Sequence, residues 1–390
     1  MLKLEKCCIH AAKPGIESSC LPEQKKHASI PTMKVEKIET VLLGIITLIL
    51  LGAVMKLASS VMLPMVIAGI LAVTLSPLVN TLNKLHIPRN LAVLIVIGVV
   101  FGVIFLIVLF IQSSIASFIA EYPKYSARFN ALNHELVMFI ESKTGTTYDF
   151  FGHIEWSGTL LRYLGSFSSS LVSFASSGLL IMIFLIFMLL ENPFAPRKMI
   201  LAFKASNGKK ISRILNRITA QVVKYLNLKF IISAGTGILV WLCLVIIGLD
   251  FAPMWGVFAF LLNFIPSVGS AMVMVITILM GFIQFYPEPG RIVAVIVSMV
   301  GIQTVIGNFI DPRLQASRLD ISPIVILFSL GFWGWIWGII GMFLAVPLTV
   351  IVQIVCQNIP FLYPVSILIG SGRKIEHIKV AKNTILEEEN

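Results

Sequence analysis

Long runs of apolar residues, separated by short polar segments, make up most of this chain. A helix that crosses a bilayer needs about 20 mostly apolar residues, whereas a membrane β-barrel shows shorter segments of alternating polarity. Because the runs are continuous, the pattern predicts an all-α polytopic membrane protein. Five runs have the length expected of a single crossing, and they cover residues 40–55, 61–82, 91–118, 165–190 and 230–248.

Beyond residue 248 the pattern changes, because one motif occurs twice. Leu-Asp-Phe-Ala-Pro (249–253) opens a long apolar run, and Leu-Asp-Ile-Ser-Pro (319–323) opens another one 70 positions later. Both runs are longer than one crossing needs, and both are interrupted near the middle, at Ile-Pro-Ser-Val-Gly (265–269) and at Gly-Ile-Ile-Gly (338–341). Each run is therefore predicted to form two short helices around a break.

Two membrane arrangements of these runs are open. Each run crosses once, or each is a re-entrant hairpin that returns to the side from which it came. Cytoplasmic segments are enriched in Lys and Arg, and only the hairpins place Arg313 and Arg318 in the cytoplasm. We therefore favour two re-entrant or broken hairpins, which form an inverted repeat because an odd number of crossings separates them. This gives about eight membrane segments, with both termini in the cytoplasm.

The distribution of basic residues also divides the chain into segments. The most basic segment, 192–229, contains nine Lys and Arg residues and no acidic residue, and its apolar residues recur at helical spacing. We interpret it as amphipathic helices on anionic lipid; calmodulin-like or nucleic-acid binding would use a similar composition. The predicted order is a cytoplasmic tail (1–37), three spans (38–118), an external amphipathic segment (119–164), a fourth span (165–191), the basic segment (192–229), a transport core containing the repeat (230–357) and a second cytoplasmic tail (358–390).

Composition excludes several classes of function. Of the 390 residues, 57% are hydrophobic and only 13% are charged, and the mean hydropathy is +0.93. The formal net charge of +11 is concentrated beside the apolar runs, so it reports topology and does not indicate nucleic-acid binding. None of the six histidines lies in an apolar run, the five cysteines lack zinc-finger spacing, and no nucleotide-binding or hydrolase motif occurs. We expect no enzymatic activity, no metal and no cofactor.

The two breaks contain the first candidates for solute binding. Pro266 removes a backbone donor and Gly269 permits a sharp turn, so that carbonyl groups are freed in the first break. Freed carbonyls and nearby polar side chains could coordinate a cation or the hydroxyl groups of a solute; the alternative is a simple kink. The predicted binding residues in the breaks are Asn263, Pro266, Ser267, Gly269, Gly338 and Gly341.

The span between the two long runs adds further polar groups. Gln303 lies inside it, and Asn308 and Asp311 stand three positions apart at its end, on one face of a helix. An acid near membrane depth is a candidate for ion coupling. Arg313, two positions later, would favour the charged form of this acid. The alternative is that Asp311 and Arg313 form an interfacial pair with no role in coupling.

Four motifs in series resemble those of a known family. They are Asn-Phe-Ile-Pro-Ser-Val-Gly (263–269), Asn-Phe-Ile-Asp-Pro-Arg-Leu (308–314), Leu-Asp-Ile-Ser-Pro (319–323) and Gly-Ile-Ile-Gly-Met-Phe-Leu-Ala-Val-Pro-Leu (338–348). Their order and spacing are similar to those of the autoinducer-2 exporter family, or PerM-like permeases, and the resemblance covers residues 38–357. It implies a bacterial inner-membrane protein without an ATPase domain. Members are assigned export of the quorum-sensing signal autoinducer-2 or sodium/proton antiport, and some assemble as homo-oligomers.

We therefore expect a secondary transporter that exports a small polar metabolite such as autoinducer-2, without ATP. Its site would lie between the two breaks, beside the polar groups of 303–311. Within transport the alternative is sodium/proton antiport, for which Asp311 is the principal acid. A second alternative is a membrane scaffold that transports nothing and holds partners through 192–229. The paired breaks argue against a scaffold, because irregular backbone in a bilayer must be satisfied by protein or by a cavity.

Overall fold

The computed structural model describes residues 32–144, 156–202, 205–316 and 321–371. Throughout these residues the regular structure is helical, without strands, as predicted for an all-α protein. The tails predicted at 1–37 and 358–390 lie largely outside the described residues. The described part includes six helices that are long and apolar enough to cross a membrane: Ser59–Lys84, Arg89–Lys143, Gly208–Ile247, Val268–Phe285, Pro289–Ile310 and Pro323–Asn358.

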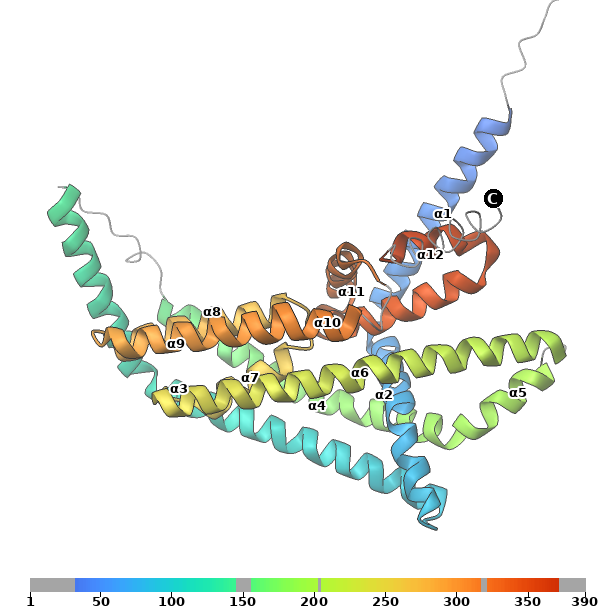
Figure 1. Ribbon diagram of the computed structural model, residues 1–390, viewed down its shortest axis with the longest axis horizontal. Coiled ribbons are helices and arrows are strands. Elements are labelled where there is room, and N and C mark those ends of the chain that lie inside the picture. Colours follow the sequence, from blue (N-terminus) through green and yellow to red (C-terminus); the bar gives the residue numbers. More distant parts are fainter. Residues whose placement is uncertain (1–31, 145–155, 203–204, 317–320, 372–390) are drawn as a thin grey trace, which may run out of the picture. The chain divides into compact units, whose positions relative to one another are not determined.

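The chain divides into two compact units, residues 1–53 and 54–390. Helix α1 (Thr32–Leu57) contains the described part of the first unit and continues into the second. All other elements belong to the second unit (Figure 1). They are α2 (Ser59–Lys84), α3 (Arg89–Thr144), α4 (Trp156–Glu191), η1 (Asn192–Phe194), α5 (Ala195–Ala202), α6 (Ala205–Ile247), α7 (Ala252–Leu262), α8 (Val268–Phe285), α9 (Pro289–Ile302), the π-helix η2 (Gln303–Ile310), α10 (Asp311–Ala316), α11 (Pro323–Asn358), η3 (Pro360–Leu362) and α12 (Tyr363–Ile369).

Helices α2, α3 and α4 pack together through aliphatic side chains. Ala68 of α2, Ala92 of α3 and Leu185 of α4 have no exposed surface. Small residues such as alanine allow helix backbones to approach closely. At one end of the bundle, the guanidinium of Arg89 donates a hydrogen bond to the carbonyl oxygen of Leu189, at 2.7 Å. These contacts hold the predicted second, third and fourth spans together.

At two of the segment boundaries expected from the sequence, 118/119 and 229/230, one helix continues across the boundary. Helix α3 runs from the third apolar run past Pro123 to Thr144, so the segment predicted to be external begins as an extension of the same helix. Helix α6 likewise joins the basic segment to the fifth span. No glycine or proline occurs between Gly208 and Gly235, so nothing in the sequence stops this helix. Tyr225, in the basic segment, is only 4% exposed and already packs inside the protein.

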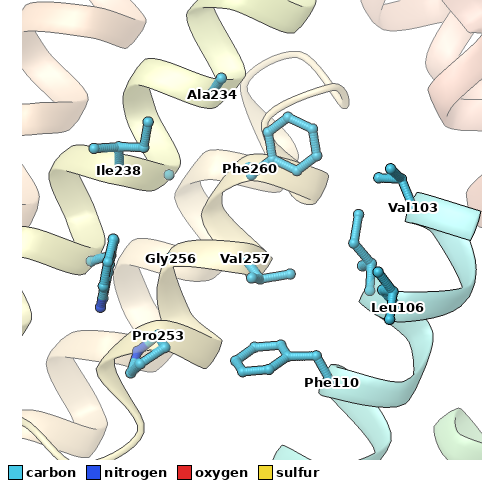
Figure 2. Close-up of a pocket in the computed structure, with 12 residues that line it drawn as sticks. Val103, Leu106, Phe110, Ala234, Ile238, Pro253, Gly256, Val257 and Phe260 are labelled. Carbon is cyan, nitrogen blue, oxygen red and sulfur yellow. The ribbon is translucent and has the colours of Figure 1, made fainter. Parts of the chain in front are cut away.

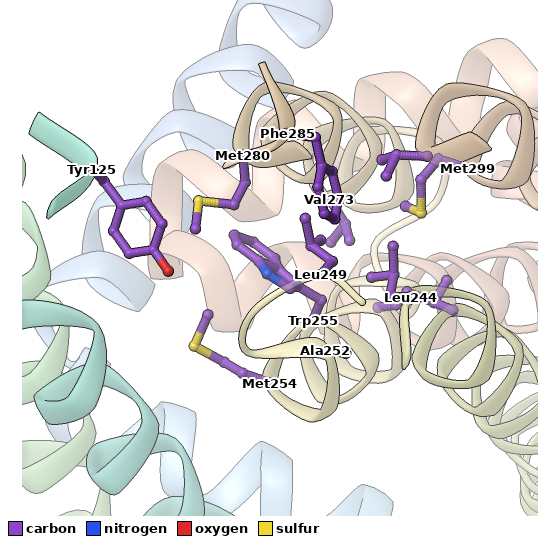
Figure 3. Packing of buried hydrophobic residues seen from close by; sticks show 13 residues of the cluster. Tyr125, Leu244, Leu249, Ala252, Met254, Trp255, Val273, Met280, Phe285 and Met299 are labelled. Carbon is purple, nitrogen blue, oxygen red and sulfur yellow. The ribbon is translucent and has the colours of Figure 1, made fainter. Parts of the chain in front are cut away.

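The first long apolar run folds back on itself as α7 and α8. Gln284, at the end of α8, accepts a hydrogen bond from the backbone N–H of Asp250 at 2.8 Å and donates one to the carbonyl of Gly248 at 3.0 Å. The beginning and the end of the run therefore lie side by side. Figure 3 shows the core of this region, in which Trp255 of α7 and Met280 of α8 pack with side chains from α6 and α9. Helix α9 lies beside α8 (Figure 1).

The second long run, α11, consists of two helices joined at Gly338. The backbone of Gly338 is non-helical, with φ 65° and ψ −146°. The hydroxyl of Ser329 donates to the carbonyl of Ala345 at 3.1 Å and lies 2.5 Å from the hydroxyl of Thr349. Residues 16 positions apart in a straight helix would be separated by about 24 Å. The two halves of α11 are therefore antiparallel, so both long runs have the predicted order of helix, break and helix.

The C-terminal half of α3 is fastened to the open end of the first hairpin. The carboxylate of Asp250 accepts hydrogen bonds from Tyr125 at 2.6 Å and from Lys124 at 3.2 Å. Beyond α8, the hydroxyl of Tyr286 donates to the carboxylate of Glu135 at 2.7 Å, and this bond raises the pKa of Tyr286. The extension of α3, the start of α7 and the loop after α8 are therefore neighbours.

Candidate functional site

The first break lies against the residues on either side of the second break. The ring of Phe264, in the first break, is stacked on the ring of Phe343, in the second hairpin, with 5.8 Å between the centroids and 15° between the planes. Ile265 is buried in the same place, in a cluster with Leu330 and Ala345 of the second hairpin. The hairpin tips are therefore in direct contact. We call this region, residues 262–270 and 333–343, the tip site.

Both tips are shaped by the close approach of a glycine to a carbonyl group. A β-carbon added to Gly269 would lie 1.8 Å from the carbonyl oxygen of Leu262, and one added to Gly341 would lie 2.0 Å from that of Trp333. No side chain fits at such distances, so each turn requires glycine. In the first tip Ser267 also has a positive φ, of 62°. The two hairpins thus turn by the same backbone contact.

Polar side chains fasten the first tip to two neighbouring helices. The amide of Asn263 donates to the hydroxyl of Ser233 in α6 at 3.0 Å, and both residues are buried. The amide of Gln303 donates to the hydroxyl of Ser270, at the start of α8, also at 3.0 Å. Buried polar groups must be hydrogen-bonded to avoid a large desolvation penalty. The same donors and acceptors are the groups that a polar solute would engage at this site.

Gln303 begins the π-helix η2, which ends at Ile310. A β-carbon on Gly307 would lie 2.7 Å from the side-chain nitrogen of Gln303, so these two residues face each other within one turn. π-Helical turns are rare and occur frequently at functional sites. The helical segment between the two hairpins therefore loses its regular α-helical register where it meets the first tip.

Asp311, the first residue after η2, forms an ion pair with Lys229 of α6. The distance between Nζ and Oδ2 is 2.8 Å, and the side chains are only 1% and 14% exposed, respectively. The sequence suggested Arg313 as the basic neighbour of this acid. In the structure Arg313 is exposed, and its guanidinium lies over the ring of Phe309 at 5.5 Å. Lys229 is therefore a partner of Asp311 that the sequence analysis missed.

The structure gathers most, but not all, of the predicted binding residues. Asn263, Gly269 and Gly341 are at the tip site, and Gln303 is bonded to it. Pro266 is half-buried in the first turn, Ser267 is exposed there, and Gly338 forms the break in α11. Asn308 is exposed on η2, and its side chain makes no hydrogen bond within the described residues.

An apolar cavity of about 540 Å³ lies between α3, α6 and α7 (Figure 2). Its lining is almost entirely hydrocarbon and includes Leu106, Phe110, Ile238 and Val257. Sites for polar molecules need polar groups placed to bind them, so this cavity does not fit a small polar solute. The polar groups at the tip site fit one better.

The sequence matches one family over most of its length. Residues 45–361 match the family described as AI-2E family transporter. The chain belongs to the AI-2E transporter family. The resemblance found in the four motifs is therefore confirmed, and it places the hairpins and the tip site inside the part of the chain that the family shares.

Individual proteins are similar to this chain over most of its length. A Borreliella burgdorferi protein is 34% identical over 334 residues, which make up 86% of this chain and 91% of that protein; its name gives transport as a provisional role and states no substrate. The AI-2 transport protein TqsA of Escherichia coli is 29% identical over 324 residues, covering 82% of this chain and 91% of TqsA. YhhT of Escherichia coli, named provisionally as a transport protein, is 30% identical over 338 residues, covering 85% and 95%.

Proposed function

We propose that this AI-2E transporter is a secondary transporter that exports a small polar metabolite, with autoinducer-2 as the first candidate. The contact between the two hairpin tips carries the proposal, because it brings together turns with irregular backbone and two polar side-chain contacts. Irregular backbone at membrane depth is tolerated where it is buried in protein or lines a cavity. The choice of autoinducer-2 is supported by the name of the related TqsA.

The contacts of α3 support a re-entrant placement of the first hairpin. Lys124 is bonded to Asp250 before α7, and Glu135 is bonded to Tyr286 after α8. If α7 and α8 together crossed the membrane once, Asp250 and Tyr286 would be on opposite sides, although both contact the same part of α3. We place them both outside. Helices α9 and η2 then cross inward, to Asp311.

The second hairpin has an equivalent contact at its open end. The backbone N–H of Ser322, before α11, donates to the carbonyl of Ile369, in α12, at 2.9 Å. In this proposal both ends lie in the cytoplasm. Two re-entrant hairpins then form an inverted repeat around the crossing by α9 and η2, within about eight membrane segments. The protein would lie in a bacterial inner membrane with both termini in the cytoplasm, and the exposed basic residues of the segment 192–229 would rest on anionic lipid.

We place ion coupling at Asp311. Any ion that drives transport must be bound reversibly within the membrane field, and acidic side chains are the usual ligands. Asp311 is paired with the buried Lys229, so a proton or sodium ion would compete with the lysine for the carboxylate. Sodium/proton antiport as the sole function would use the same acid. The two assignments therefore differ in whether an organic solute moves.

A flux experiment with purified protein in proteoliposomes tests the proposal. Vesicles are loaded with autoinducer-2 and the release of the signal is followed, with and without an imposed sodium or proton gradient. Saturable release that requires the protein and responds to a gradient supports coupled export. Sodium movement without release of any organic solute would instead identify an antiporter. Equal fluxes in vesicles with and without protein would favour the scaffold.

A further inference from the structure

Lys229 is a charged residue at a buried position, where an isolated charge would be unfavourable. Only 1% of its surface is exposed, and it lies in α6 between the buried residues Tyr225 and Ser233. Burying an unpaired ammonium group is very unfavourable. Its Nζ lies 2.8 Å from Oδ2 of Asp311, so the lysine holds this carboxylate against α6.

The ion pair lies at one end of the π-helix, and a contact with the first tip lies at the other end. Asp311 follows the last residue of η2, and Gln303 is its first residue. Gln303 is bonded to Ser270 of the tip at 3.0 Å. Helix η2 is therefore fastened at both ends, to α6 through the ion pair and to the first tip through Gln303.

Helix α6 also contacts the same tip directly. Ser233, one turn after Lys229, accepts a hydrogen bond from Asn263 at 3.0 Å. The ion pair, the Gln303 bond and the Asn263 bond thus form a closed ring that joins α6, η2 and the first tip. Each of these contacts involves at least one residue that is buried or half-buried.

We propose that Lys229 is a positioning residue for the tip site: its ion pair with Asp311 keeps η2 in the π-form and thereby keeps Gln303 bonded to Ser270. If η2 tightens by one residue toward an α-helix, the residues after it turn by about 100° relative to those before it. Both end contacts cannot survive such a rotation. Release of the ion pair therefore releases the first tip. This proposal rests on the proposed function for its place in the transport cycle.

A disulfide cross-link between the tip and η2 measures this coupling without any need for transport. Ser270→Cys and Gln303→Cys are introduced together into protein whose five native cysteines are replaced by alanine. The rate of disulfide formation under copper-phenanthroline is measured in vesicles. The rate is compared between the intact ion pair and the double variant Lys229→Met with Asp311→Asn. Since both charges are removed together, no unpaired charge remains buried.

We expect the cross-linking rate to fall at least ten-fold in the neutral double variant. Lys229→Asp combined with Asp311→Lys keeps a pair of opposite charges and should restore the rate to within about three-fold, since the attraction between the charges is retained. The matched control is Arg291→Met with Glu288→Gln, an exposed pair at the other end of the same crossing. Its rate should match that of the intact protein. An unchanged rate in the neutral double variant would overturn the proposal.

A second variant keeps the test decisive if the neutral pair lowers the amount of folded protein. Deletion of Val305, an exposed residue within η2, removes one residue from the π-helix while Lys229 and Asp311 remain. The cross-linking rate should fall here too, and a rate equal to that of the intact protein would contradict the role of η2.

If the rate responds as expected but vesicles release no solute, the proposed function fails and the positioning role stands. If solute is released and the rate does not respond, only the positioning role fails.

Discussion

Gly269 lies so close to the carbonyl oxygen of Leu262 that a β-carbon would be 1.8 Å from it. This contact brings the start of α8 back onto the end of α7. Gly341 and Trp333 have the same relationship in the second hairpin, at 2.0 Å. Both hairpins therefore turn through the same kind of contact, between a glycine and a backbone carbonyl, and their tips touch. Two independent kinks would not explain this similarity.

Replacing Gly269 should disable the tip site. Leucine at this position must push the Leu262 carbonyl away, and overpacking of this kind typically costs about 1–3 kcal/mol of stability. We expect Gly269→Leu to insert into the membrane and to release autoinducer-2 from vesicles at less than about a tenth of the normal rate. Gly290→Ala is the matched control, because nothing lies within 4 Å of a β-carbon there. Normal flux in Gly269→Leu would show that the first break is an idle kink.

Gly341→Ala tests whether the second tip contributes in the same way. Even a methyl group would meet the Trp333 carbonyl at 2.0 Å, so alanine should suffice to open the turn. A loss of flux comparable to that of the Gly269 variant is expected, with Gly331→Ala as the control because its surroundings are open. If Gly341→Ala transports normally while Gly269→Leu does not, the site belongs to the first hairpin alone.

The ion pair of Lys229 and Asp311 should show strong energetic coupling. Removing one partner of a buried pair leaves an uncompensated charge, which typically costs about 3–5 kcal/mol, whereas removing both partners costs much less. Lys229→Met and Asp311→Asn should therefore each lower the unfolding temperature in detergent more than the double variant does. Additive effects of the two single changes would indicate that the charges do not depend on each other.

The membrane topology can be read from cysteine labelling. Glu288→Cys, in the exposed loop before α9, should react with an impermeant thiol reagent added outside the cell. Arg313→Cys, exposed beyond η2, should be protected until the membrane is opened. The re-entrant placement requires this result, because α9 and η2 separate the two positions. The opposite labelling would restore a single crossing for each long run.

Much of the fold follows from hydrophobic periodicity and from breakers. The five single apolar runs correspond to α1, α2, α3, α4 and α6. The structure also has breaks at the predicted positions, near Pro266 and at Gly338. Helix ends in polar segments were harder to predict. The sequence predicted amphipathic segments next to α3 and α6, but not that their helices would join the neighbouring spans; contacts such as that of Tyr125 with Asp250 stabilise this continuation.

The tip site could be predicted only in part. Pro266 and Gly269 predict an irregular turn. Ser233 and Ser270 are single polar residues within apolar runs, and nothing in the sequence indicates that they bind Asn263 and Gln303, respectively. The burial of Lys229 could not be predicted for a different reason. It is the last of nine basic residues in a segment that reads as a solvated surface, and only the continuity of α6 carries it into the interior. Pairing between residues 82 positions apart has no local signature.

Protection of the first tip by solute is the most direct test of the central claim that a small polar metabolite binds between the hairpin tips. Ser267 is exposed in the first turn, so Ser267→Cys, in protein without its native cysteines, should react readily with a thiol reagent in vesicles. Autoinducer-2 should slow this reaction in a saturable manner, while labelling of Glu288→Cys, outside the tip site, should not change. If a saturating concentration of autoinducer-2 leaves the rate at position 267 unchanged, the signal does not bind at the tips and the central claim is contradicted.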